Sequence, residues 1–356
     1  MNAAPLTVVH LEDEPWDSGI AHYAVTLAVE QKRRGWGVEF WGRADSPALK
    51  AAEAGGVAVR GFDGGAHAWL RLPVLRRLTR ERRVDLLDAH TGSSHALALA
   101  VAAGSSIAVV RTRGDARPAK RGPLGALVGA RTAAFIAANE SLAASLRGAY
   151  PGRPVSVVAQ GVAGPRSAPP LPDAPVVGLL ARLDPVKGHD ALLDAAVALK
   201  ATVPGLRVVC AGEGAQRDRL RWQLKPVGLE GVVSFPGFVA DKDAFIASCR
   251  VGVVPSLGSE AVSRAALEWM AAGRPVVASA VGGLPDLVEH GVSGLLVAPG
   301  DGKALAEALA HLLKDPARAA AYGRAGHERW RRLFSPEPFF QNTAKVFHEA
   351  LHRPAP

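Results

Sequence analysis

The fold is decided by the stretch VGVVPSLGSEAVSRAALEWMAAGRPVVA, residues 251–278. It opens with a short run of valines, which is typical of a strand buried on both faces. A loop of small residues follows, and then an apolar helix that ends at Gly273, a residue suited to the left-handed position after a helix. Pro275 leads into the next apolar run. A strand, a helix and a second strand in this order make one unit of a parallel α/β sheet.

Strand-length apolar runs alternate with helical segments along the whole chain. Strands are predicted at residues 6–10, 37–41, 57–60, 84–89, 107–112, 133–137 and 155–158, and again at 176–181, 207–211, 232–235, 251–255, 275–278 and 294–297. Predicted helices include residues 20–34, 93–103 and 140–147, the last with Asn139 as its N-cap. This alternation predicts α/β architecture with two doubly wound, Rossmann-like parallel sheets.

A proline-rich segment, residues 163–175, separates the two series of strands and has the composition of a semi-rigid linker. We therefore expect one domain over residues 1–165 and a second over residues 174–333. Two such sheets facing a cleft would carry their ligands at the carboxyl ends of the strands. Functional residues should accordingly lie in loops that directly follow strands.

Composition narrows the class of protein. The 356 residues carry a net charge of +9, mostly from residues 1–165, and only 6% are aromatic. Without aromatic and basic residues interleaved, an anionic small molecule or lipid head group is a better partner than nucleic acid. Cys210 and Cys249 are too few for a cysteine metal site and should be buried thiols. The absence of a membrane-length apolar run or a basic leader predicts a cytoplasmic protein.

Residues 251–278 contain two carboxylates that are candidates for a ligand site. Glu260 lies in the loop after the strand, and the helix that begins near Ser263 offers free backbone N–H groups around Ala261 and Val262 for an anion. Glu268 lies inside the apolar helix, where a carboxylate needs a partner. Ribose hydroxyls would supply one, and an exposed place on the outer face of the helix is the alternative.

A second loop carries two cations. Arg182 follows the strand at 176–181, and Lys187 lies where the next helix should begin. An arginine fork and a lysine point charge around one helix end suit a diphosphate. Two solvated surface cations are the alternative.

The first half of the chain has its own candidates. Gly19 begins a helix and would let the backbone approach a ligand. His90 follows the strand at 84–89, although a lone histidine in a loop is often a surface residue. A basic run contains Arg111, Arg113 and Arg117, with Lys120 and Arg121 beyond it. This run could hold acceptor phosphates or be a solvated loop.

Residues 69–83 combine arginines with apolar residues. Such a segment could lie on an anionic membrane surface. It could equally be a helix that covers the sheet and turns a basic face to solvent.

These motifs together resemble retaining glycosyltransferase family 4, also called glycosyl transferases group 1. The resemblance rests on Glu260 and Glu268 with Arg182 and Lys187 upstream. It extends to a glycine turn at Gly212 and to residues 235–239, 282–288 and 291–297. It is specific over residues 175–300 and collinear over residues 1–165. Ala261 stands where the family commonly has glycine, and Ser18 replaces the first residue of its N-terminal glycine pair.

The resemblance implies a GT-B fold and a nucleotide-sugar donor, a UDP-sugar, with no cofactor and no metal. Catalysis would involve Glu260, His90, Arg182 and Lys187, with Glu260 and His90 near the donor sugar and the two cations neutralising the diphosphate. Glu268 would bind the ribose. Donor loops would include the following residues: Gly19, Gly212, Ala261, Val262 and Ser263.

The resemblance also bears on the acceptor. It implies that residues 1–165 bind the acceptor, that residues 174–333 bind the nucleotide sugar, and that a C-terminal helix in residues 334–356 packs back on the first domain. Together with the basic charge, it suggests an anionic or lipid-linked glycan acceptor, such as a lipopolysaccharide-core-like glycolipid. The enzyme could then sit peripherally at the inner face of the cell membrane.

Two other functions remain open. The first is a protein that binds nucleotide sugars without transferring them, because one fold can host both. The second is an NAD(P)-dependent oxidoreductase, but no G-x-G-x-x-G fingerprint follows the first strand. Asp241 and Asp243 resemble a metal-binding pair, yet their place before a predicted helix favours capping.

Overall fold

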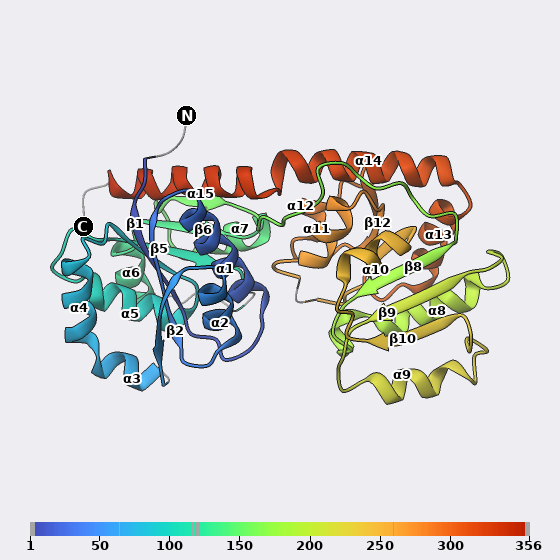
Figure 1. Cartoon of the computed structure of the whole chain (residues 1–356), viewed down its shortest axis with the longest axis horizontal. Helices are drawn as coiled ribbons and strands as arrows, with labels where there is room; N and C mark the ends of the chain where they lie inside the picture. The colour runs from blue at the N-terminus through green and yellow to red at the C-terminus, as the bar shows by residue number, and fades with distance from the viewer. Residues whose placement is uncertain (1–3, 64, 116, 118–121, 259, 353–356) are drawn as a thin grey trace. The chain divides into compact units, whose positions relative to one another are not determined.

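The computed structural model describes residues 4–352 except 64, 116, 118–121 and 259. The chain separates into two compact units (Figure 1). The first unit joins Met1–Gly161 to Pro336–Pro356, and the second is Val162–Ser335. Each unit is built on one parallel sheet covered by helices.

The first unit has a seven-stranded sheet in the order β3-β2-β1-β4-β5-β6-β7. Its strands are β1 (Thr7–Glu12), β2 (Gly37–Arg43), β3 (Ala58–Phe62), β4 (Leu86–Ala89), β5 (Ala108–Arg113), β6 (Ala134–Ala137) and β7 (Val155–Val157). Its helices are α1 (Gly19–Arg33), α2 (Pro47–Ala54), α3 (Gly65–Leu70), α4 (Leu72–Glu81), α5 (Gly92–Ala102), α6 (Gly122–Ala130), α7 (Glu140–Ala149) and α15 (Pro336–Leu351).

The second unit has a six-stranded sheet in the order β10-β9-β8-β11-β12-β13. Its strands are β8 (Val176–Leu180), β9 (Arg207–Ala211), β10 (Val233–Gly237), β11 (Val251–Val254), β12 (Val276–Ser279) and β13 (Gly294–Val297). A 3₁₀ turn, η1 (Pro185–Lys187), precedes its helices, which are α8 (His189–Leu199), α9 (Arg217–Leu224), α10 (Lys242–Ser248), α11 (Arg264–Ala271), α12 (Leu284–Leu287), α13 (Gly302–Leu313) and α14 (Pro316–Leu333).

Strand order reverses once in each sheet. In the first unit the reversal lies between β1 and β4, and in the second it lies between β8 and β11. Ligands of open α/β sheets bind at such switch points, beyond the carboxyl ends of the strands. The loops after β1, β4, β8 and β11 are therefore the places to look for a site.

The last helix of the chain completes the core of the first unit. Phe339 and Phe347 of α15 are fully buried. The Phe339 ring meets the edge of Tyr23 on α1, at 4.9 Å between centroids, and Phe340 meets Trp36 at 5.4 Å. Apolar burial of this kind is what holds α15 on α1, β5 and β6.

The structure agrees with several local expectations from the sequence. The side chains of Asn139 and Asp241 cap α7 and α10, accepting from the backbone N–H of Leu142 and Ala244. Cys210 and Cys249 are buried and free. Among the described residues, no helix has the length and apolar character needed to span a membrane.

Two local expectations were wrong. The helix expected to begin near Lys187 begins at His189, because the left-handed Gly188 separates it from η1. Arg111 and Arg113 belong to β5 and are buried, where a basic loop was expected. Their guanidinium groups find polar partners inside the unit, so the arginines do not need water.

Candidate functional site

The switch point of the second unit brings Lys187 to Glu260. Lys187 ends η1 after β8, and Glu260 lies in the loop after β11. The Lys187 Nζ lies 2.6 Å from Glu260 Oε1, and the Ser256 hydroxyl donates to the same oxygen at 2.7 Å. The Glu260 side chain is only 4% exposed. A nearly buried carboxylate thus has a lysine and a hydroxyl as its neighbours.

Glu268 has cationic partners as well. It is buried on α11, and its Oε1 accepts from Lys242 Nζ at 2.7 Å and from Arg264 at 3.1 Å. Lys242 is held at the start of α10, directly after the capping Asp241. The alternative of an exposed carboxylate on the outer face of α11 is therefore wrong. Because every contact described for Glu260 and Glu268 uses Oε1, the geometry suits a further polar group at the other oxygen.

Two glycines let the loops around Glu260 pack closely. A Cβ on Gly188, which has a φ of +71°, would lie 1.8 Å from the carbonyl oxygen of Pro255. A Cβ on Gly282, with a φ of +58°, would lie 2.5 Å from the carbonyl oxygen of Glu260. Both positions combine a left-handed backbone with direct contact to another backbone segment, so only glycine fits them.

The other donor-site candidates lie around the same edge of the sheet. Ser263 is the N-cap residue of α11, and Ala261 and Val262 are half-buried before it. The backbone N–H of Gly212, after β9, donates to the Gly237 carbonyl at 2.8 Å. Arg182 differs from Lys187, because its side chain is 73% exposed and lies 3.6 Å from Asp184.

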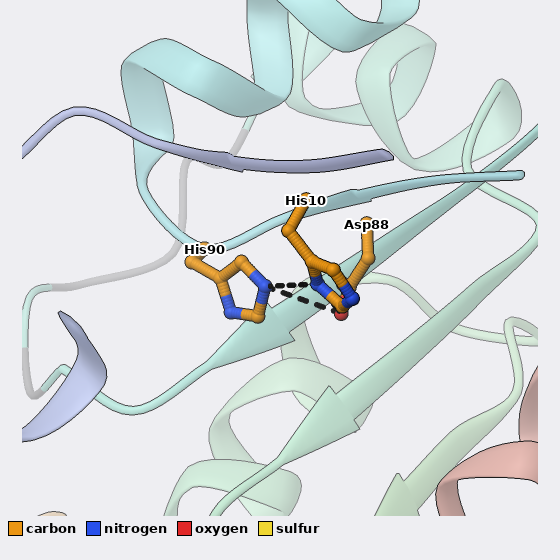
Figure 2. Close-up of side chains that lie close together, drawn as sticks. All are labelled: His10, Asp88 and His90. Carbon is orange, nitrogen blue, oxygen red and sulfur yellow. Dashed lines mark hydrogen bonds and ion pairs between the residues drawn. The ribbon is translucent and has the colours of Figure 1, made fainter. Parts of the chain in front are cut away.

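At the switch point of the first unit, His90 belongs to a buried cluster with His10 and Asp88 (Figure 2). The Nε2 of His90 lies 3.0 Å from His10 Nδ1 and 3.3 Å from Asp88 Oδ2. Burial lowers the pKa of the His90 imidazole, although the Asp88 charge opposes this. Burial would raise the pKa of Asp88, but the two imidazoles hold it below its usual range. His90 is therefore not a surface residue.

Sequence reasoning missed His10 and Asp88. Their contact follows from the pairing of β1 with β4, which places His10 directly opposite Asp88. No local motif could have revealed it, since 78 residues separate the two positions. Within the described part of the chain, the atoms of His10, Asp88 and His90 that could hold a metal ion lie within 4.8 Å of one another. Spacing along the sequence had suggested no such group.

The remaining candidates of the first unit make the following contacts. Gly19 begins α1 behind the capping Ser18. Arg111 donates to the Ala89 carbonyl at 3.0 Å, and Arg113 donates to the Asp115 carbonyl at 3.3 Å. Arg117 is 67% exposed and lies 3.8 Å from Glu14. Lys120 and Arg121 fall outside the described residues.

A pocket lies at the carboxyl ends of β1 and β2 in the first unit. It is lined by the following residues: Leu11, Glu12, Asp13, Trp41, Gly42, Arg43, Phe62, Ala68, Ser94 and Leu97. Burial, with smaller contributions from Glu14 and Asp13, raises the pKa of the Glu12 carboxyl to about 8. Its Oε2 has no hydrogen-bond partner among the described residues. Sequence reasoning did not single out Glu12.

Both units match known protein families. Residues 18–163 match the family "Glycosyltransferase Family 4", and residues 174–315 match "Glycosyl transferases group 1". The two matches together cover most of the chain and meet near the boundary between the units.

Curated relatives are similar over about half of the chain. A GDP-mannose-dependent alpha-(1-6)-phosphatidylinositol monomannoside mannosyltransferase of Mycobacterium tuberculosis is 36% identical over 177 residues, 45% of each protein. A D-inositol 3-phosphate glycosyltransferase of Thermobispora bispora is 37% identical over 192 residues, 51% of this chain and 44% of that protein. The chain thus spans less than half the length of these relatives.

Solved structures are similar over nearly the whole chain. The Anabaena protein Alr3699/HepE in complex with UDP has a TM-score of 0.82 at 22% identity, covering 96% of this chain and all of that one. A glycosyltransferase from Rickettsia africae has a TM-score of 0.86 at 14% identity, covering 98% and 100%. At these identities the likeness concerns the fold, which is GT-B. With a family match in each unit and this fold, the chain belongs to glycosyltransferase family 4, the glycosyl transferases of group 1.

Proposed function

We propose that this protein transfers a sugar from a nucleoside-diphosphate sugar to a hydroxyl of an anionic or lipid-linked glycan, with retention at the anomeric carbon. The observation that carries the proposal is the arrangement at the switch point between β8 and β11. Two nearly buried carboxylates there, Glu260 and Glu268, each form an ion pair with a lysine. Carboxylates suit sugar and ribose hydroxyls, and lysine and arginine suit a diphosphate.

The cations would supply the chemistry at the leaving group. As the bond from the sugar to the diphosphate breaks, negative charge develops on the phosphate oxygens. Lys187 and Arg182 would stabilise that charge, and a preorganised charge of this kind is usually the largest single term in catalysis. The acceptor hydroxyl would attack from the face that the diphosphate leaves, giving its proton to the departing phosphate. The carboxylates would bind the donor, and no metal ion would be required.

The donor we propose is a UDP-sugar. The curated relatives are named for GDP-mannose or for inositol phosphate, whereas Anabaena HepE was solved with UDP and UDP-glucose. The acceptor we propose is phosphate-bearing or lipid-linked, as the basic charge of the chain suggests. A lipid-linked acceptor would bring the enzyme to an anionic membrane surface.

The test is an intact-mass transfer assay that compares UDP-sugars with GDP-mannose, using phosphatidylinositol and inositol phosphate as acceptors. We expect a product heavier by one sugar residue, unchanged yield in the presence of a chelator, and a product anomer that matches the donor. Glu260→Gln and Glu268→Gln should each reduce turnover by about 10²-fold or more. Glu328→Gln is the matched control, because Glu328 forms an exposed carboxylate–arginine pair on α14.

Each alternative has its own signature. Tight nucleotide-sugar binding without transfer to any acceptor would indicate a binding protein. Activity that is lost with the chelator and restored by magnesium or manganese would contradict the metal-free mechanism. Equal losses in the Glu328→Gln control would show that charge in general, not the switch-point site, governs turnover.

A further inference from the structure

The buried cluster of the first unit sets the position of one proton. Its three facing atoms are His10 Nδ1, His90 Nε2 and Asp88 Oδ2, separated by 3.0, 3.3 and 3.5 Å. All three side chains are fully buried. Figure 2 shows both imidazole rings and the carboxylate converging on one point between β1 and β4. Because all three side chains are fully buried, each nitrogen is best satisfied as a hydrogen-bond donor or acceptor.

The outer contacts of the cluster determine these roles. His10 Nε2 lies 2.7 Å from Gln31 Oε1, an acceptor, so His10 carries its proton on Nε2. When the ring carries a single proton, its Nδ1 is then a bare acceptor. The contact of 3.0 Å to His90 Nε2 needs a donor, and this places the His90 proton on Nε2.

Asp88 favours the same proton position. Its Oδ2 lies closer to His90 Nε2, at 3.3 Å, than to His10 Nδ1, at 3.5 Å. Its Oδ1 is occupied by the Thr112 hydroxyl, which donates at 2.8 Å. A carboxylate charge at this distance attracts an N–H and repels a bare nitrogen lone pair. Both His10 Nδ1 and Asp88 Oδ2 therefore favour the His90 proton on Nε2.

This proton position determines the state of the other ring nitrogen of His90, Nδ1. With the proton on Nε2, Nδ1 is a bare lone pair, and among the described residues it has no hydrogen-bond partner although it is buried. A buried polar atom left unpaired destabilises the folded state. His90 directly follows β4 at the switch point, where ligands of this kind of sheet bind.

We propose that Gln31, His10 and Asp88 are positioning residues that fix the proton of His90 on Nε2, so that its Nδ1 accepts a hydrogen bond from a hydroxyl of a bound sugar substrate. The ligand class rests on the proposed transferase function. The proton position rests only on the geometry of the cluster. An imidazole with the opposite tautomer would present an N–H at the same place and would not pair with a hydroxyl hydrogen.

The test is long-range ¹H–¹⁵N correlation NMR on the full-length protein labelled at histidine, without substrate and near neutral pH. A bare ring nitrogen and a protonated one give distinct ¹⁵N signals, and the His90→Gln variant assigns the resonances. We expect His90 in the wild-type protein to show a bare Nδ1 and a protonated Nε2. Asp88→Asn removes the charge near Nε2 and should populate the Nδ1–H form.

Thr112→Val is the matched control. It removes the partner of Asp88 Oδ1 but leaves Oδ2 in place, so the His90 tautomer should not change. In the transfer assay, Asp88→Asn should lower kcat about 10²-fold, as does the loss of one preorganised hydrogen bond. Thr112→Val should retain most of the turnover.

The outcomes separate this proposal from the proposed function. A wild-type spectrum with the proton on Nδ1 would overturn it, even if the enzyme transfers sugar normally. Stoichiometric zinc or another transition metal in the purified protein would also overturn it, because a cation would then occupy the place of the proton. A bare Nδ1 with an unchanged kcat in Asp88→Asn would refute the positioning role. If the protein transfers no sugar, the spectrum still decides where the proton lies.

Discussion

Individual side chains at the edge of the second sheet should differ in how much they contribute to the free energy of unfolding. Lys187 contacts the nearly buried Glu260, whereas Arg182 is largely exposed beside Asp184. Surface ion pairs contribute about 0–1 kcal/mol, but removing one partner of a buried polar group costs about 1–3 kcal/mol. Stability and turnover should therefore separate at these two positions.

We expect Lys187→Met to lower the free energy of unfolding by about 1–3 kcal/mol, because Glu260 then keeps only the Ser256 hydroxyl as a hydrogen-bond partner among the described residues. Arg182→Gln should leave it within about 0.5 kcal/mol of the wild type. Both variants should lose about 10²–10³-fold in kcat. Chemical denaturation and transfer kinetics measure the two effects. Normal turnover in Arg182→Gln would remove Arg182 from the diphosphate site.

The buried carboxyl of Glu12 should make the stability of the protein depend on pH. Its pKa in the folded protein is raised to about 8 from the ordinary value of 4.5, mainly by burial. Between these values the folded state holds a proton that the unfolded state has released, so stability falls as pH rises through this window. Glu12→Gln removes the dependence. We expect it to be more stable than the wild type by several kcal/mol at pH 8 and above.

Comparing the stability of Glu12→Gln and the wild type at several pH values separates the effect of Glu12 from that of the other carboxyls. Below about pH 4.5 the variant and the wild type should differ little, since Glu12 is protonated in both states there. Glu53→Gln, at an exposed position on α2, is the control and should show no such divergence. Parallel stability curves for Glu12→Gln and the wild type would contradict the raised pKa.

At the level of elements, α3 and α4 carry apolar side chains on both their core side and their solvent side. Ala68, Leu75 and Leu78 pack into the core of the first unit, as a sheet-covering segment should. The solvent side nevertheless carries Trp69, Leu70 and Val74, which are 46%, 77% and 41% exposed. The exposed cationic side chains of the same segment are Arg71, Arg77, Arg80, Arg82 and Arg83. Apolar residues flanked by arginines match an anionic lipid surface.

We expect the protein to co-sediment with vesicles containing an anionic lipid and not with neutral vesicles, and to be released by salt. Arg77→Gln and Arg80→Gln should each weaken binding by about 1 kcal/mol. The double variant Trp69→Ala, Leu70→Ala should weaken it about 10-fold. Trp222→Ala is the control, as Trp222 is 81% exposed on α9, beside Arg221. Equal binding to both kinds of vesicle would rule out this surface.

Elements and local caps could be predicted from the sequence, since buried parallel strands are recognisable as short apolar runs. Contacts between elements could not. One of the two cationic partners of Glu268, Lys242, is 26 residues away and belongs to another helix. The contact of His10 with Asp88 depends on the order of strands in the sheet. Arg111 was expected in a basic loop, either binding acceptor phosphates or solvated, yet carbonyl oxygens inside the unit satisfy it.

For the whole molecule, α15 is the element that ties distant parts of the chain together. It contributes fully buried phenylalanines to the first unit, although all of the second unit precedes it in sequence. We expect Phe339→Ala to destabilise the first unit by about 3–5 kcal/mol through the cavity it leaves. Hydrogen exchange should then accelerate in β5 and β6, which α15 contacts.

Hydrogen exchange in the second unit of Phe339→Ala serves as the internal comparison. Exchange in β8 and β9 should remain close to wild type, because Phe339 contributes to the core of the other unit. Phe238→Ala is a control for the substitution itself, since Phe238 is 81% exposed and should alter exchange in neither sheet. Acceleration in β8 equal to that in β5 would show that the units do not open separately.

The place of α15 in the chain also affects how the protein is made. The strands of the first unit leave the ribosome early, but the helix that covers β5 and β6 follows Ser335 and is synthesised after the whole second unit. The second unit is one continuous segment, Val162–Ser335, and can finish folding while the first still lacks a helix. During that interval the apolar side chains that later meet Phe339 and Phe347 stay uncovered, as a substrate for chaperones. In a nascent chain of this protein, the first unit is therefore the part most prone to aggregation until α15 has been translated.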